Sequence, residues 1–172
     1  MTATKTASTT AKSNASRKAN GDDAIELLTQ DHRDVKKLFS TFRKMVDDDA
    51  PSQERQDIAV QICEALTAHA AVEEEIFYPA LREASADSTD ELDEAEVEHA
   101  SVKDLIAQIQ DMDPDDELYN AKVKVLGEYV THHVQEEEQE MFPKAKKAKL
   151  DMDALGSQLQ ARKDELLEHS VM

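Results

Sequence analysis

The sequence has no tryptophan, and among its 172 residues it has only three glycines, four prolines and 4% aromatic residues. Ala, Glu, Lys and Leu dominate instead, and this composition favours helices over strands and turns. The single cysteine, Cys63, cannot form an internal disulfide, which suits a reducing compartment. We find no apolar run long enough to span a membrane and no signal-peptide apolar segment. These absences predict an all-α, cytoplasmic protein without a membrane partner.

Positive charge is also scarce, because 20 basic residues face 38 acidic ones and the formal net charge is -18. Such a surface repels nucleic acid and can attract cations, so no specific nucleic-acid partner is expected. Residues 1–21 differ, since they contain four basic residues and no acid. Residues 1–20 also contain no Leu, Ile, Val or Phe, so they cannot bury enough apolar surface to offset the entropy of ordering. We therefore predict a disordered basic tail over 1–21.

Four segments between residues 22 and 149 place apolar residues three or four positions apart, which is the spacing of a helix-bundle seam. They predict an antiparallel up-down four-helix bundle over 22–149. Asp113 and Pro114 are expected to cap and open the fourth helix, while Pro79 and Pro143 should kink or end the second and fourth. Leucines at helical spacing then predict an extra C-terminal amphipathic helix over 150–172.

Each seam contains one histidine where an apolar residue is expected. The segment "HAAVEEEIFYP" (69–79) returns 64 residues later as "HVQEEEQEMFP" (133–143), and "DHRDVKKL" (31–38) returns 67 residues later as "EHASVKDL" (98–105). The chain therefore reads as two helical hairpins related by approximate two-fold symmetry. The seam histidines are His32, His69, His99 and His133.

Glutamates follow two of these histidines at the i+4 position, Glu73 after His69 and Glu137 after His133. Residues i and i+4 share one helix face, so four imidazoles and two carboxylates should converge in one layer of an apolar interior. Unpaired buried carboxylates cost several kcal/mol each, and two divalent metal ions would compensate them better than imidazolium would. His132 competes with its neighbour, but only His133 lies on the seam. The other glutamates of the two runs are expected to supply solubility or to contact the ligands from outside: Glu74, Glu75, Glu136 and Glu138.

These motifs closely resemble the hemerythrin-like, HHE cation-binding family over roughly residues 23–149. The resemblance implies a four-helix bundle with a non-haem di-iron centre bridged by an oxo or hydroxo group. It implies that His32 and His69 bind one iron, that His99 and His133 bind the other, and that Glu73 and Glu137 bridge them. Manganese and zinc remain alternatives to iron.

One departure concerns residue 103. The oxygen-carrying members have a second histidine four residues after the third-helix histidine, whereas Lys103 stands there in this chain. The position that this ligand would fill is expected to hold water, to hold Glu96, or to stay open. Counting six positions per metal leaves one open on each, which favours chemistry with O2, peroxide or nitric oxide over reversible oxygen carriage.

Three functions follow from these residues. The first is a cytosolic stress protein that binds, senses or reacts with O2, peroxide or nitric oxide. The second is an iron-buffering protein without turnover, and the third is a metal-free helical interaction module. A ferritin-like carboxylate oxidase is disfavoured, because it needs two Glu-x-x-His motifs and Glu96–His99 is the one inward-facing candidate. Oligomeric state is left open.

Overall fold

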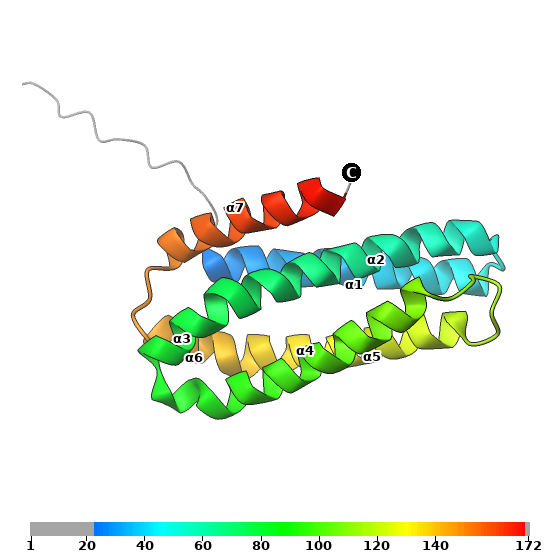
Figure 1. The fold of residues 1–172 in the computed structure, drawn as a ribbon. Helices are drawn as coiled ribbons and strands as arrows, with labels where there is room; N and C mark the ends of the chain where they lie inside the picture. Colours follow the sequence, from blue (N-terminus) through cyan, green and yellow to red (C-terminus); the bar gives the residue numbers. More distant parts are fainter. Residues whose placement is uncertain (1–22, 171–172) are drawn as a thin grey trace, which may run out of the picture.

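The computed structural model describes residues 23–170, which form helices and short connections with no strand in that range. Four long helical segments, called rods here because two of them join several helices end to end, lie side by side and alternate in direction. This confirms the predicted all-α, antiparallel four-helix bundle (Figure 1). Their first helices are α1 (Ala24–Asp47), α2 (Ser52–Val72), α4 (Thr89–Gln110) and α5 (Tyr119–Glu136). Around the bundle, α1 contacts α2, α2 contacts α4, α4 contacts α5, and α5 contacts α1. The predicted disordered tail lies outside the described residues.

The second and fourth rods continue past Pro79 and Pro143. The prediction that these prolines kink or end the helices is therefore wrong in so far as neither helix ends there. Helix α2 passes through a π-helical turn, η1 (Glu73–Phe77), into α3 (Tyr78–Ala84), and α5 passes through η3 (Glu137–Met141) into α6 (Phe142–Lys147). Proline lacks an N–H and crowds the carbonyl four residues back, so a wider turn lets the helix accommodate Pro79 and Pro143. Both π turns begin at a predicted metal ligand.

The start of the fourth helix was predicted wrongly. Helix α5 begins at Tyr119, and Asp113 and Pro114 belong to a turn before it. In that turn Oδ1 of Asp113 accepts a hydrogen bond from the N–H of Asp115 at 2.9 Å, and Asp116 accepts one from the N–H of Asp113 at 3.2 Å. Aspartates satisfy the backbone locally here, which competes with helix formation. A short 3₁₀ turn, η2 (Ala86–Ser88), makes the connection between α3 and α4.

Two apolar clusters fill the bundle, and a polar layer lies between them. One cluster includes Leu28, Phe77, Leu92 and Phe142 near α3 and α6. The other includes Val35, Ile62, Val102 and Leu126 toward the opposite end. Among the described residues seven polar or charged side chains are buried, and all but Ser88 are the predicted ligands: His32, His69, Glu73, His99, His133 and Glu137.

A further helix, α7 (Met152–Ser170), lies along the outside of α1 and α2 (Figure 1). Leu155 and Leu159 are buried beneath it, and the Arg162 guanidinium binds both carboxylate oxygens of Glu75 in η1. The predicted C-terminal helix is therefore present, while the division of the chain after residue 149 remains a prediction. Within residues 23–170 no helix is long and apolar enough to cross a membrane.

Candidate metal centre

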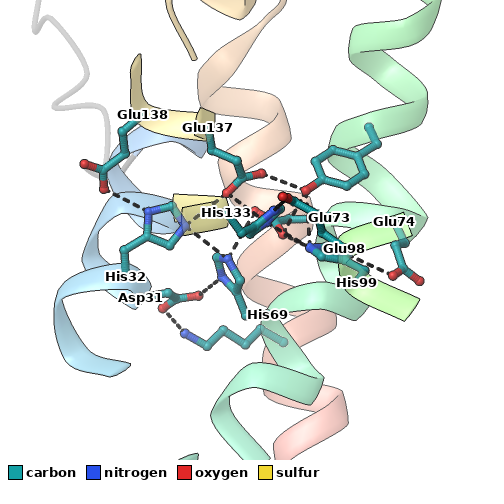
Figure 2. Close-up of polar contacts among 12 residues, drawn as sticks. Asp31, His32, His69, Glu73, Glu74, Glu98, His99, His133, Glu137 and Glu138 are labelled. Atoms are coloured by element: carbon teal, nitrogen blue, oxygen red, sulfur yellow. Dashed lines mark hydrogen bonds and ion pairs between the residues drawn. The ribbon is translucent and has the colours of Figure 1, made fainter. Parts of the chain in front are cut away.

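All six predicted ligand side chains point into one layer of the bundle, and none of these residues is more than 7% exposed (Figure 2). Their ring nitrogens meet in pairs. Nε2 of His32 lies 3.2 Å from Nε2 of His69, and Nε2 of His99 lies 3.0 Å from Nε2 of His133. The pairs are those that the family resemblance assigns to separate metal ions.

Each glutamate of the layer contacts one histidine of each pair. Oε1 of Glu73 lies 3.1 Å from Nε2 of His69, and its Oε2 lies 3.4 Å from Nε2 of His99. Oε2 of Glu137 lies 3.2 Å from Nε2 of His32 and 3.5 Å from Nε2 of His133. The two carboxylates therefore span the two histidine pairs, which is the placement that bridging ligands need.

A second set of carboxylates holds the outer nitrogen of every histidine. Nδ1 of each ring lies 2.7 to 3.2 Å from a carboxylate oxygen on the neighbouring helix. A carboxylate can only accept, so Nδ1 carries the hydrogen and Nε2 of the neutral ring presents its lone pair to the centre. The pairs are His32 with Glu138, His69 with Asp31, His99 with Glu74, and His133 with Glu98 (Figure 2).

Sequence reasoning found only half of these outer carboxylates. Glu74 and Glu138 were expected to contact the ligands from outside, whereas Asp31 and Glu98 were not singled out. Glu75 instead binds Arg162 on α7, and Glu136 lies 3.1 Å from the exposed His132. The sequence does carry a signal for all four outer carboxylates, because each is the immediate sequence neighbour of an inward-pointing ligand.

Tyr78 is a further residue of the layer that the sequence did not reveal. Its hydroxyl donates to Oε1 of Glu137 at 2.7 Å and lies 3.3 Å from Oε2 of Glu73 and 3.4 Å from Nε2 of His99. Phe142 occupies the equivalent repeat position, and its ring stacks on His32 at a centroid distance of 5.8 Å. The two repeat positions therefore differ by one hydroxyl group.

Lys103 and Glu96 both lie outside the layer. Nζ of Lys103 contacts the two carboxylate oxygens of Glu74 at 2.6 and 2.7 Å, so it supports the outer partner of His99. Glu96 is exposed and pairs with Arg82 at 3.0 Å. Neither side chain reaches the histidine nitrogens. Because Glu96 does not point inward, residues 96–99 do not form the inward-facing Glu-x-x-His motif that a ferritin-like oxidase needs. Lys163 of α7 likewise supports Asp31, the outer partner of His69.

The layer shifts the proton affinity of its own groups. Burial lowers the pKa of His69, but the nearby charge of Glu73 and the hydrogen bond to Asp31 outweigh it and raise the pKa to about 10. For His133, burial is likewise outweighed by the hydrogen bond to Glu98 and the charge of Glu137, and its pKa rises to about 9. Burial raises the pKa of Glu73, yet the adjacent His69 and His99 bring it well below its ordinary value. The centre is thus built to hold positive charge.

Divalent cations fit this donor set. Oε1 of Glu73 and Oε2 of Glu137 are buried and have no hydrogen-bond partner among the described residues. Their closest neighbours are imidazole nitrogens, and two neutral Nε2 lone pairs facing each other at about 3 Å repel unless a cation or proton lies between them. Imidazole and carboxylate together suit iron, zinc and manganese, and the outer carboxylates fix the rings in the ligating tautomer.

A cavity of about 300 Å³ reaches the centre. Its lining runs from exposed Asp34 and Glu64 to all four seam histidines, and residues of α1, α2, α4, α5 and α7 contribute to it. Asp31, Gln61 and Lys163 also line the cavity, and the rest of its wall is aliphatic, including Val35, Leu38, Ala65, Leu66, Val102, Val130 and Val134. Small uncharged molecules therefore have space next to the histidines.

Comparisons with known proteins agree with this fold. The fold resembles the crystal structure of a hemerythrin HHE cation-binding domain-containing protein from Mycobacterium kansasii, with a TM-score of 0.72, 22% identity, and coverage of 87% of this chain and 90% of that one. A curated protein from Nostoc sp. (strain PCC 7120), named a DNA nickase, is 32% identical over 118 residues. That match covers 68% of this chain but spans only 32% of the relative.

The family model for the hemerythrin HHE cation-binding domain matches residues 23–145, which include all six residues of the polar layer. The match covers most of the chain. Cation binding is thus the function that the family and the buried donor set indicate together. The chain belongs to the hemerythrin HHE cation-binding family.

Proposed function

We propose that the centre holds two iron ions and that the protein binds, senses or reacts with O2, peroxide or nitric oxide in a cytoplasmic stress role. His32 and His69 would hold one ion, His99 and His133 the other, and Glu73 and Glu137 would bridge them. The observation that carries this proposal is the placement of each glutamate between the two histidine pairs. When bound, a pair of irons supplies the electrons that chemistry with O2 or peroxide requires.

The protein's own residues supply position, protons and exclusion of water. The carboxylates at Nδ1 orient the four rings, and the Tyr78 hydroxyl holds Glu137 while placing a proton donor inside the layer. Leu66, Val102 and Val130 line the cavity beside the histidines and leave an apolar space there. Such a space supports reaction with a small ligand over iron buffering, because a storage site does not need a cavity next to its ligands.

The test is metal analysis, optical spectroscopy and peroxide consumption on the same iron-loaded sample. We expect about two irons per chain, near-ultraviolet absorption typical of a bridged ferric pair, and conversion of hydrogen peroxide to water and O2. His69→Ala should lose all three properties, while Glu96→Ala, which changes an exposed carboxylate paired with Arg82, should keep them. Two bound irons without any reaction with peroxide, O2 or nitric oxide would leave iron buffering as the function. A stoichiometry near zero would overturn the metal centre itself.

DNA nicking forms no part of the proposal. DNA nickase is the name of the relative from Nostoc, and the match spans only 32% of that relative. The net charge of -18 opposes binding to a phosphate backbone.

A further inference from the structure

A second cluster of ligand-type side chains lies at the protein surface, in the groove between α4 and the rod formed by α5 and η3. Nε2 of His132 lies 3.1 Å from Oε1 of Glu136 and 3.5 Å from Oε1 of Glu98. One potential ligand atom from each of these three residues lies within 4.8 Å of the others. The His132 side chain is 64% exposed, so the cluster is open to solvent. Two carboxylates and one imidazole are a donor set for divalent Fe, Mn or Zn.

The internal repeat shows that this cluster is peculiar to one hairpin. Shifting His132 and Glu136 by the repeat offset of 64 residues gives Ala68 and Val72, which are both buried. Shifting Glu91 and Glu94 by 67 gives Ala24 and Leu27, and shifting Glu140 by 64 gives Ile76. Only Glu98 keeps an acidic equivalent, Asp31, which is paired with Lys163, so the same groove is mostly apolar in the first hairpin and acidic in the second.

The groove of the first hairpin is apolar because helix α7 packs against it. Its Leu155 and Leu159 join the buried cluster that contains Ala24, Leu27 and Val72. The acidic groove on the opposite hairpin has no such cover among residues 23–170, and its side chains face solvent. Covering one of two related grooves and lining the other with carboxylates gives the bundle one cation-attracting side.

The acidic groove leads directly to the buried layer. Beneath the cluster is a small cavity of about 20 Å³, lined by Glu98 and Glu136 near the surface and by His133 and Glu137 at its inner end. Glu137 is 1% exposed, and its Oε2 has no hydrogen-bond partner among the described residues. This oxygen also faces Nε2 of His32 and of His133, so the inner end of the cavity opens on the ligand atoms of the buried layer.

Glu98 belongs to both ends of the path. Its Oε1 faces His132 on the surface, while its Oε2 accepts a hydrogen bond from Nδ1 of His133 at 2.7 Å. Glu94 and Glu140 add exposed negative charge along the same cavity, whereas the charge of Glu91 is already paired with Lys144. A groove lined by one sign of charge raises the local concentration of the opposite ion.

We propose that Glu98, His132 and Glu136 form a separate, solvent-facing site for a divalent metal ion, and that metal reaches the buried centre through it. The role as a route rests on the proposed function of the buried centre, whereas the surface site itself does not. A cation there would neutralise the facing carboxylates of α4 and η3. It would also lie one side chain away from His133 and Glu137.

Two measurements on the full chain test the site and the route separately. For the site, Zn²⁺ is added at two ions per chain, which the buried centre takes up, and Mn²⁺ is then titrated while electron paramagnetic resonance counts the free ion. Mn²⁺ binds nitrogen and oxygen sites more weakly than Zn²⁺, so it should report the outer site without displacing the inner ions. For the route, metal-free protein is mixed with Co²⁺, and the visible absorption of the bound ion gives the rate of uptake.

The variants are chosen in matched pairs on one rod. Glu136→Gln is compared with Glu128→Gln, the same substitution two helical turns earlier at an exposed position. His132→Ala removes a ligand, and His132→Asp replaces it with another. We expect wild type, Glu128→Gln and His132→Asp to bind one Mn²⁺ per chain. Glu136→Gln and His132→Ala should bind none and should take up Co²⁺ about tenfold more slowly.

Each other result contradicts a definite part of the inference. Mn²⁺ binding that is absent from wild type, or unchanged in both Glu136→Gln and His132→Ala, would overturn the surface site. Loss of Mn²⁺ binding with unchanged Co²⁺ uptake would keep the site and overturn the route. A wild-type chain that binds Mn²⁺ in the groove but neither Zn²⁺ nor Co²⁺ in the layer would overturn the proposed function and leave the surface site standing.

Discussion

Glu98 holds the histidine of the next helix rather than its own neighbour, because its Oε2 lies 2.7 Å from Nδ1 of His133 while His99 is held by Glu74. The same displacement repeats around the bundle, so each rod contributes an outer carboxylate that fixes a ring on the adjacent rod. Removing any one of the four therefore loosens a ligand on a different helix. This arrangement couples the packing of the rods to the geometry of the polar layer.

The first prediction concerns Glu138, whose Oε1 lies 2.9 Å from Nδ1 of His32. Glu138→Ala should lower metal affinity by about 10- to 100-fold, because the ring loses the partner that fixes its tautomer and orientation. Competition with a chromophoric chelator measures the change. Glu96→Ala is the control, since it removes an exposed carboxylate that binds Arg82 instead of a histidine. Equal affinity of the two variants would contradict the role assigned to the outer carboxylates.

The second prediction separates two adjacent histidines. The His133 side chain is 7% exposed and faces Glu137, whereas that of His132 is 64% exposed and faces Glu136. After prolonged loading, His133→Ala should retain clearly less tightly bound metal than wild type, while His132→Ala should retain the same amount. Elemental analysis after desalting measures both. The opposite pattern would show that the ligand on this rod is His132.

The sequence was sufficient for the bundle and for the convergence of six polar side chains. Helical periodicity alone assigns His32, His69, His99 and His133 to seams, because a seam residue must face the interior. The outer carboxylates could not be paired in the same way. Each reaches a neighbouring rod, and that pairing depends on the relative rotation and height of two helices, which periodicity along one helix does not specify.

Tyr78 was missed for a local reason. In an ordinary α-helix residue i+5 points about 140° away from residue i, so Tyr78 would not face the same way as Glu73. The structure has a π turn there, in which the N–H of Tyr78 donates to the carbonyl of Glu73. That wider turn brings the phenol over the carboxylates. The aromatic-proline pairs were visible in the repeat, but their consequence for side-chain direction was not.

The third prediction uses the difference between Tyr78 and its repeat partner Phe142. Tyr78→Phe places the same side chain at both repeat positions and removes the hydrogen bond to Oε1 of Glu137. A buried acceptor left without its donor costs about 1–3 kcal/mol, which for a chain of this size lowers Tm by roughly 2–4 °C per kcal/mol. In the metal-free protein we expect that full loss, and in the metal-loaded protein a smaller one, since metal also binds this carboxylate.

Differential scanning calorimetry of both forms checks this prediction. Phe142→Tyr provides the reciprocal variant, because it adds a hydroxyl beside His32 on the half that lacks one. An identical loss of Tm in the two forms of Tyr78→Phe would mean that the hydroxyl acts only through packing. No loss in either form would mean that Glu137 does not depend on it.

The last prediction concerns the pH dependence of the metal-free protein. The pKa of His69 rises to about 10 and that of His133 to about 9, against an unfolded value of about 6.5. Groups with raised pKa values in the folded state stabilise it fully below pH 6.5, and this contribution is lost as pH rises through 9 and 10. The pKa of Glu73 is instead well below its ordinary value of 4.5, so its contribution is lost on acidification below that value.

These signs place the greatest stability of the metal-free protein between about pH 4.5 and 6.5, with Tm falling from there toward pH 10. Metal-loaded protein should fall less over the same range, because metal ions take the place of the protons on the ring nitrogens. The difference in Tm between loaded and chelator-treated samples should therefore widen from pH 5 to pH 9. The metal-free His133→Gln variant should show a shallower fall, since one of the two titrating rings is absent. A metal-free Tm that rises between pH 6.5 and 9 would contradict the assignment of positive charge to this layer.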